Sequence, residues 1–188
     1  MAVQLVYETH AITTDNEAGI ATGWLPGRLS ARGRETAAEL GARRRDDGLT
    51  AVLVSDLERA LETVRIAFAG SPIPVVVDER LRECNYGRLN GMPRPRLDVE
   101  RATHVDEPWP GGESYRDVVK RTAAFLDDLV RRWDERRVVV VAHSANKVAL
   151  DHLLLRTDLG ELVEHPMDWR PGWEYLVPKE WRAPTSAC

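Results

Sequence analysis

Short apolar runs recur along the chain and predict the strands of one sheet. They lie at residues 3–7 (VQLVY), 51–54 (AVLV), 73–77 (IPVVV) and 138–142 (VVVVA), and a fifth run at 173–177 (WEYLV) predicts an edge strand. The first four are apolar rather than alternating with polar residues, which is typical of strands covered on both faces. Strands of this kind need helices between them.

Helical patterns fill the gaps between these runs. The sequence predicts one helix after Ser30, which is a good N-cap, one from Asp56 to about Phe68, and one after Ser114. The third helix has a single apolar stripe at helical spacing, formed by Val118, Thr122, Phe125, Leu126, Leu129 and Trp133. A fourth helix is predicted after His143. Strands that alternate with helices predict an α/β fold, a three-layer α/β/α sandwich with a mostly parallel central sheet.

Polar side chains follow the predicted strands. His10 follows the first strand, Ser55 and Asp56 the second, Glu83 the third, and His143 the fourth. Ligands of such sheets bind beyond the carboxyl ends of the strands, so we expect these side chains to converge on one rim.

The composition fits one domain and excludes several classes of partner. The 188 residues predict a single domain over residues 1–178 and a loosely held tail over 179–188. A formal net charge of −4 argues against a nucleic-acid surface, and no run approaches the roughly 18 apolar residues of a membrane span. Two cysteines argue against a disulfide framework and fit a reducing cytoplasm. Apolar residues in the segment DWRPGWEYLV predict either a homodimer contact or closure of the sheet edge.

The candidate chemistry is phosphoryl transfer through a covalent intermediate. Neutral imidazole is a nucleophile near pH 7, so His10 can attack phosphorus, while His143 offers a second cation if it is protonated. Arg59 has a planar fork suited to phosphate, and Asn16 offers an amide donor. Glu83 can protonate the leaving oxygen and later deprotonate a water molecule. His104, His152 and His165 are interpreted as structural or solvated residues.

Six motifs in register resemble those of the histidine phosphatase superfamily, the phosphoglycerate mutase-like group. LVYETHAITTDN is similar to LVRHGxTxxN, and the resemblance makes His10 the nucleophile and Asn16 a phosphate contact. TGWLPGRLSARG resembles TGWxDxxLSxxG, in which Thr22 and Gly23 fall where substrate is often touched. SDLERALET resembles SDLxRAxxT, with Arg59 at a phosphate-binding arginine.

The remaining motifs extend the resemblance to about residue 155. LRECNYGRLNG resembles LxExxxGxxxG and places Glu83 at the general acid/base, with Tyr86 bordering the cleft. PGGES precedes the long helix, as in the family. VVVVAHSANKVAL resembles vlvVaHgxxxral, which makes His143 the second active-site histidine and Ser144 its neighbour at the phosphate. The resemblance implies no metal and no cofactor.

The sequence departs from the family at the nucleophile itself. Thr9 stands where the family has arginine, Ala11 where it has glycine after the first histidine, and Ser144 where it has glycine after the second. A lost arginine removes several charge-assisted hydrogen bonds to a phosphoryl group. Three outcomes follow: Thr9 and an arginine from elsewhere among 23 rebuild the pocket, the scaffold serves non-phosphate acid/base chemistry or ligand binding, or the protein is inactive. The other five family residues are all retained, which favours the first outcome, a rebuilt phosphate pocket. They are His10, Asn16, Arg59, Glu83 and His143.

The length of one segment separates hydrolysis from mutase activity. In the mutases of this family a long insertion holds the substrate's second acidic group, whereas here 18 residues separate Gly91 from Pro110. That brevity favours a phosphatase, although Arg94, Arg96 and Arg101 lie within the segment and suit an acidic substrate. We therefore expect a metal-independent phosphomonoester hydrolase acting on a small organic or sugar phosphate. Trp24, Trp109 and Tyr86 fall in loops near the cleft and would suit a ring-bearing leaving group if they do not simply pack.

Overall fold

A five-stranded sheet forms the centre of the protein. The computed structural model describes residues 1–165 and 167–184. Strand order is β4-β3-β6-β1-β7, and β1, β3, β4 and β6 run parallel while β7 pairs antiparallel with β1. The strands of this sheet are β1 (Ala2–Thr9), β3 (Ala51–Val54), β4 (Val75–Val77), β6 (Arg137–Ala142) and β7 (Trp173–Pro178). The predicted mostly parallel sheet with an edge strand at WEYLV is confirmed.

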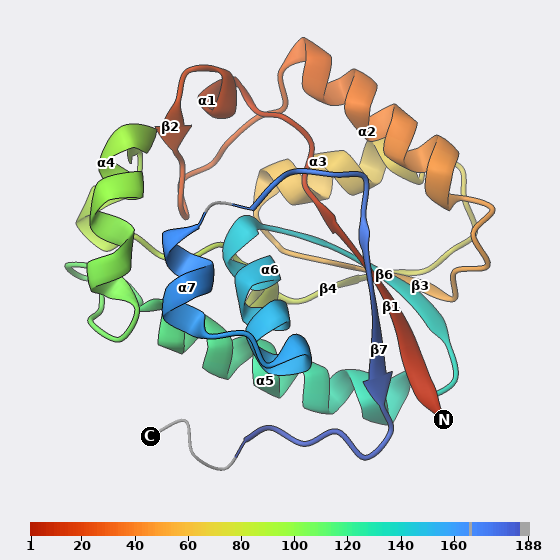
Figure 1. The fold of residues 1–188 in the computed structure, drawn as a ribbon. Helices are drawn as coiled ribbons and strands as arrows, with labels where there is room; N and C mark the ends of the chain where they lie inside the picture. The colour runs from red at the N-terminus through yellow and green to blue at the C-terminus, as the bar shows by residue number, and fades with distance from the viewer. Residues whose placement is uncertain (166, 185–188) are drawn as a thin grey trace.

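Helices cover both faces of the sheet and complete a three-layer sandwich (Figure 1). Helices α2 and α3 pack together on one face, and α5 and α6 pack together on the other. The helices are α1 (Thr14–Glu17), α2 (Ala31–Arg44), α3 (Glu58–Ala67), α4 (Arg94–Glu100), α5 (Tyr115–Arg132), α6 (Ser144–Leu150) and α7 (Leu159–Glu164). A π-helical turn (Asp151–Leu155) continues α6, and 3-10 turns lie at Glu79–Leu81, Gly87–Leu89 and Arg101–His104. The short strands β2 (Ile20–Ala21) and β5 (Met92–Pro93) pair at the rim.

Local signals explain where the two longest helices begin. Ser30 and Ser114 are the N-caps of α2 and α5, and each hydroxyl accepts an N–H of the first turn. Asp117 completes a capping box with Ser114, since its carboxylate accepts the Ser114 N–H. The predicted helix after Asp56 begins at Glu58. The two serine caps act on N–H groups within one helical turn, which is why the sequence predicts the starts of α2 and α5.

Alternate residues of β1 enter two separate cores. Val3, Leu5 and Tyr7 pack with α5, whereas Val6 packs with residues of α2 and α3. The prediction that every parallel strand is covered on both faces is wrong for β4, where Val75 and Val77 are 47% and 52% exposed. The reason is position: β4 is an edge strand of three residues, and its apolar sequence does not distinguish it from a central strand.

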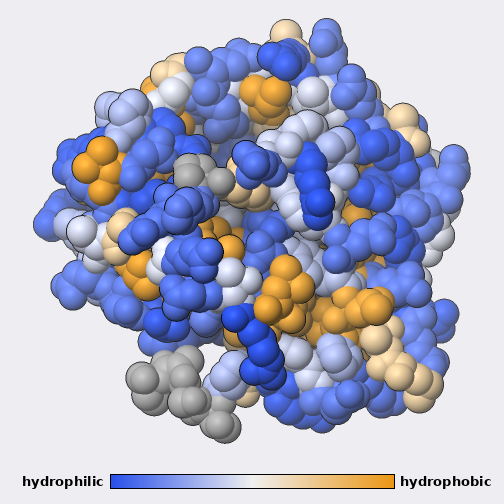
Figure 2. All heavy atoms as spheres, viewed as in Figure 1, coloured by the Kyte–Doolittle hydropathy of each residue, from blue (hydrophilic) through white to orange (hydrophobic). Residues whose placement is uncertain are grey.

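The C-terminal strand closes one edge of the sheet. Leu176 on β7 is 70% exposed, and Figure 2 shows a group of hydrophobic residues around the lower part of this strand on a face that is otherwise mainly hydrophilic. The alternative, a homodimer contact, stays a prediction. Beyond β7, Lys179 pairs with Asp134 and the Ala183 N–H donates to Asp127, while the rest of the predicted tail, 185–188, lies outside the described residues. No helix in the described part of the chain is long and apolar enough to cross a membrane.

Candidate active site

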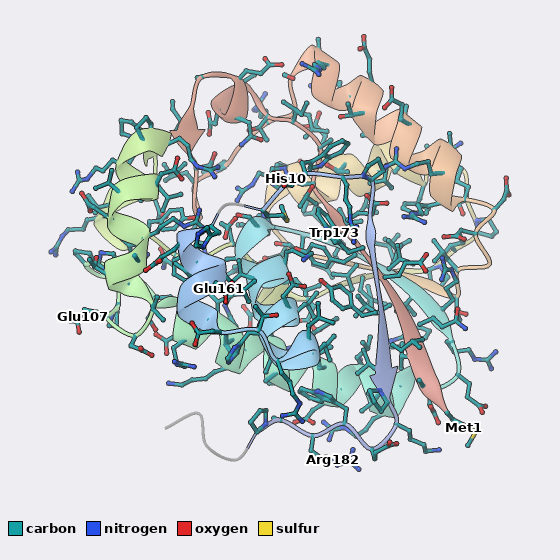
Figure 3. The ribbon with its side chains drawn as sticks, viewed as in Figure 1. Met1, His10, Glu107, Glu161, Trp173 and Arg182 are labelled. Atoms are coloured by element: carbon teal, nitrogen blue, oxygen red, sulfur yellow. The ribbon has the colours of Figure 1, made fainter. Side chains whose placement is uncertain are left out.

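Strand register places the two predicted histidines side by side. Thr9 lies opposite Ala142 in the parallel pair β1–β6, so His10 and His143 are the next residues on neighbouring strands. The His10 N–H donates to the Ala142 carbonyl at 2.9 Å, and the two ring centroids are 5.0 Å apart. Figure 3 labels His10 at the carboxyl end of β1, where the segment between α7 and β7 crosses. The predicted convergence on one rim is present for both imidazoles.

Hydrogen bonds fix the orientation of the His10 ring. Its Nδ1 lies 2.8 Å from the Ala11 carbonyl, which can only accept, so Nδ1 carries the hydrogen and Nε2 has the lone pair. The Arg59 Nε donates to that Nε2 at 3.3 Å. Burial and the nearby Arg59 guanidinium lower the pKa of His10 to about 3. His10 is therefore neutral at physiological pH, as a nitrogen nucleophile must be.

Thr63 ties the loop after β1 to helix α3. Its fully buried hydroxyl accepts the Ala11 N–H at 3.0 Å and donates to the Arg59 carbonyl at 2.7 Å. Since Ala11 orients His10, this one hydroxyl links the His10 ring to the helix that bears Arg59. In the sequence, Thr63 is the last residue of the motif SDLERALET, and no role was predicted for it.

Arg59 is buried against the rim and held by two carbonyls. Its Nη2 donates to the Gly23 carbonyl at 2.8 Å and its Nη1 to the Leu25 carbonyl at 3.3 Å. Burial lowers the pKa of Arg59, and the Glu83 carboxylate opposes that shift. Gly23 has φ +57°, and a Cβ there would lie 1.9 Å from the Asn90 Oδ1. Gly23 is thus required by both its conformation and its close neighbour.

Glu83 presents its two carboxylate oxygens differently. Oε1 accepts the backbone N–H groups of Cys84 at 2.8 Å and Ala145 at 3.2 Å. Oε2 accepts the Ser144 hydroxyl at 3.0 Å, and a hydroxyl can rotate to become an acceptor. Oε2 is therefore the oxygen suited to take up and release a proton. Ser144 is the hydrogen-bond partner of this oxygen.

His143 lies behind His10 rather than at the cavity surface. The residue is fully buried, its Nε2 is 2.9 Å from the Ser55 Oγ, and Nδ1 has no hydrogen-bond partner among the described residues. Burial, Arg59 and His10 lower the pKa of His143 well below its ordinary value. The lowered pKa of His143 disfavours the protonated ring that a second cation requires.

A cavity of about 310 Å³ opens beside these residues. Nine predicted site residues line it: Thr9, His10, Asn16, Thr22, Gly23, Arg59, Glu83, Tyr86 and Ser144. The Asn16 Oδ1 accepts the Thr13 N–H. The Asn16 amide nitrogen has no protein partner in the described chain, so Asn16 can stabilise this turn and also donate a hydrogen bond to a ligand. The Thr22 hydroxyl donates to Asp15. No group of three or more His, Cys, Asp or Glu side chains among the described residues is arranged to hold a metal.

The aromatic residues at this cavity differ from those expected. The Trp24 indole donates to the Glu83 carbonyl at 2.7 Å, and Trp109 is buried in contact with His104, so neither lines the cavity. Tyr86 does line it. Sequence reasoning missed Trp169, which lines the cavity from the segment between α7 and β7. No local signal marks it, because its place depends on a contact with Thr9, 160 positions away.

The segment between Gly91 and Pro110 also reaches the cavity. Helix α4 and the 3-10 turn after it bring Arg94 and Arg101 to the lining. Arg101 is buried, and its Nε has no partner among the described residues. Arg96 pairs with Glu100 on the outer surface instead. Three arginines therefore border the cavity, although none directly precedes His10.

Comparison with known proteins identifies the family. Residues 9–169 match the model of the histidine phosphatase superfamily (branch 1). A glucosyl-3-phosphoglycerate phosphatase of Mycolicibacterium vanbaalenii is 35% identical over 81% of this chain and 74% of its own length. A probable phosphoglycerate mutase of Erwinia tasmaniensis is 30% identical over 75% of this chain and 69% of its own length. The structure of a mycobacterial glucosyl-3-phosphoglycerate phosphatase with VO3 superposes with a TM-score of 0.72, at 30% identity and 85% coverage of each chain. The chain therefore belongs to the histidine phosphatase superfamily.

Proposed function

We propose that this protein is a metal-independent phosphomonoester hydrolase that forms a phosphohistidine at His10. The observation that carries the proposal is the state of the His10 ring. Its Nδ1–H is fixed on the Ala11 carbonyl, and the Nε2 lone pair lies beside the Arg59 guanidinium at the cavity. A neutral, oriented imidazole next to a buried guanidinium suits attack on a phosphoryl group.

In the first step, the Arg59 N–H releases the His10 Nε2 lone pair and turns to a phosphoryl oxygen. The freed Nε2 attacks phosphorus, and the bond from phosphorus to the ester oxygen breaks. Glu83 protonates the departing oxygen from Oε2, so that a neutral alcohol leaves.

In the second step, a water molecule attacks the phosphohistidine. The Glu83 carboxylate takes a proton from the water, the bond from phosphorus to Nε2 breaks, and inorganic phosphate leaves. His10 regains its lone pair and Glu83 its proton, so the cycle closes without another reactant.

Four hydrogen-bond donor groups hold the phosphoryl oxygens in this proposal. Arg59 supplies charge, and the amide of Asn16 and the hydroxyl of Thr9 supply neutral hydrogen bonds. The Thr9 Oγ1 accepts the Trp169 indole N–H at 3.2 Å, and the hydroxyl hydrogen has no protein acceptor within the described residues. Arg94 or Arg101, which border the same cavity, would provide the arginine that is missing before the nucleophile.

Relatives of both kinds, phosphatases and mutases, resemble this chain, so the choice of hydrolysis is part of the proposal. The segment between Gly91 and Pro110 is short and contains β5, α4 and one 3-10 turn. A short cover leaves water access to the phosphohistidine, which supports hydrolysis over transfer to a second substrate.

The test is phosphate release from a panel of aryl, alkyl, sugar and carboxylic-acid phosphates without added metal. We expect turnover in the wild type and a loss of about a thousandfold or more in His10→Ala. Vanadate, which occupies a relative of known structure, should raise the melting temperature of the wild type. Activity retained in His10→Ala would contradict the mechanism. No turnover and no vanadate stabilisation would favour non-phosphate chemistry or binding on this scaffold, and isomerisation of phosphoglycerate without phosphate release would favour a mutase.

A further inference from the structure

Trp169 has an unusual position for a large aromatic residue. It lies in the segment that crosses the carboxyl end of β1 between α7 and β7 (Figure 1), and its side chain lines the cavity that contains His10. It is 63% exposed, whereas Trp109 and Trp173 are buried. An indole left open to water inside a binding cavity is a surface available to a ligand.

One edge of the Trp169 ring is anchored beside the nucleophile. Its Nε1–H donates to the Thr9 hydroxyl oxygen at 3.2 Å, and Thr9 directly precedes His10. The leaving group of a phosphate ester bound at His10 would therefore lie close to the Trp169 ring. Thr9, which stands where the family motif has arginine, here joins the end of β1 to the Trp169 ring.

Apolar side chains form part of the cavity lining, beside Arg94 and Arg101. Leu97, Val148 and Met167 line it together with Trp169 and Ile20. Apolar side chains of this kind can bury the faces of a flat ring. Methionine sulfur next to an aromatic ligand adds a favourable contact.

We propose that Trp169 stacks on a flat ring in the leaving group, so that the protein selects phosphomonoesters of ring-bearing alcohols. This inference rests on the proposed hydrolase function and names its substrate class. Trp169 is then a specificity residue that acts on the alcohol rather than on the transferred phosphoryl group.

The experiment compares kcat/KM for benzyl, cyclohexylmethyl and propyl phosphate in the wild type, Trp169→Ala and Trp169→Phe. The three esters release alcohols of similar acidity but differ in whether the group is flat, bulky or small. We expect the wild-type ratio of benzyl to propyl phosphate to fall about tenfold in Trp169→Ala and to stay within about threefold in Trp169→Phe, which keeps a ring but loses the N–H. The preference for benzyl over cyclohexylmethyl phosphate should disappear in Trp169→Ala.

Selectivity ratios separate this role from a general loss of activity or stability. Leu176→Ala, which removes an exposed side chain of β7 outside the cavity, is the matched control and should leave the ratios unchanged. If the wild type hydrolyses the esters and Trp169→Ala has the same selectivity ratios, the proposed role of Trp169 is overturned and the proposed hydrolase function is not. A wild type that hydrolyses none of these three esters but releases phosphate from other members of the wider panel would overturn this inference alone, and a wild type that hydrolyses no ester of either set would overturn the proposed function as well.

Discussion

Replacing Thr63 with valine tests the link between the nucleophile and helix α3. Valine has nearly the same shape but removes the hydroxyl that accepts the Ala11 N–H and donates to the Arg59 carbonyl. The carbonyl keeps its helical partner four residues on, so the main cost is the buried, unpaired Ala11 N–H, about 1–3 kcal/mol. For a domain of this size the melting temperature should fall by about 2–12 °C.

Activity should fall with stability, because the Ala11 carbonyl orients the His10 ring. A ring displaced by a fraction of an ångström would lower kcat for benzyl phosphate by about tenfold, with a smaller change in KM. Thermal unfolding followed by circular dichroism and initial rates of phosphate release measure the two effects.

The chain offers a matched control for this substitution. Thr122 on α5 is also fully buried, but its Oγ1 has no hydrogen-bond partner among the described residues. Thr122→Val should therefore be neutral or stabilising, and Thr63→Ser should retain most of the wild-type stability. A Thr63→Val protein that loses no more stability than Thr122→Val would refute the reasoning.

Three further predictions concern the same rim. Gly23→Ala should lower both stability and activity, since φ is +57° and the new Cβ would collide with Asn90, and wild-type melting and turnover would contradict it. Arg59→Lys keeps a charge but loses the fork, so its affinity for vanadate should fall about tenfold, and equal inhibition constants would argue against Arg59 as a phosphoryl contact. Because the pKa of His10 is lowered to about 3, the unfolded chain binds more protons below about pH 6.5, and folding stability falls as the pH falls. Between pH 8 and 5 this group should cost about 2 kcal/mol, so His10→Asn should lose about that much less than the wild type in denaturant titrations, and equal losses would contradict a neutral His10.

Local patterns in the sequence determined the layers of the fold and most of the candidate site. Apolar runs, N-cap serines and helical spacing act over one or two turns, so they placed β1, β3, β6 and β7 and the starts of α2 and α5. Parallel strands end on the same side of a sheet, so residues that follow them, such as His10, meet at one rim. That geometric regularity is why His10, Glu83 and His143 could be placed at one rim before the structure, whereas Thr22 and Gly23 were named only from the resemblance to the family.

Only the tertiary structure decided which state those residues adopt and what surrounds them. The neutral form of His10 depends on burial and on Arg59, and the place of His143 behind it depends on Ser55 and the sheet. The contact of Trp169 with Thr9 joins residues 160 positions apart, so no local pattern encodes it. Sequence periodicity reports which faces are apolar, whereas charge states and cavity walls follow from long-range packing, and here that packing sets the chemistry.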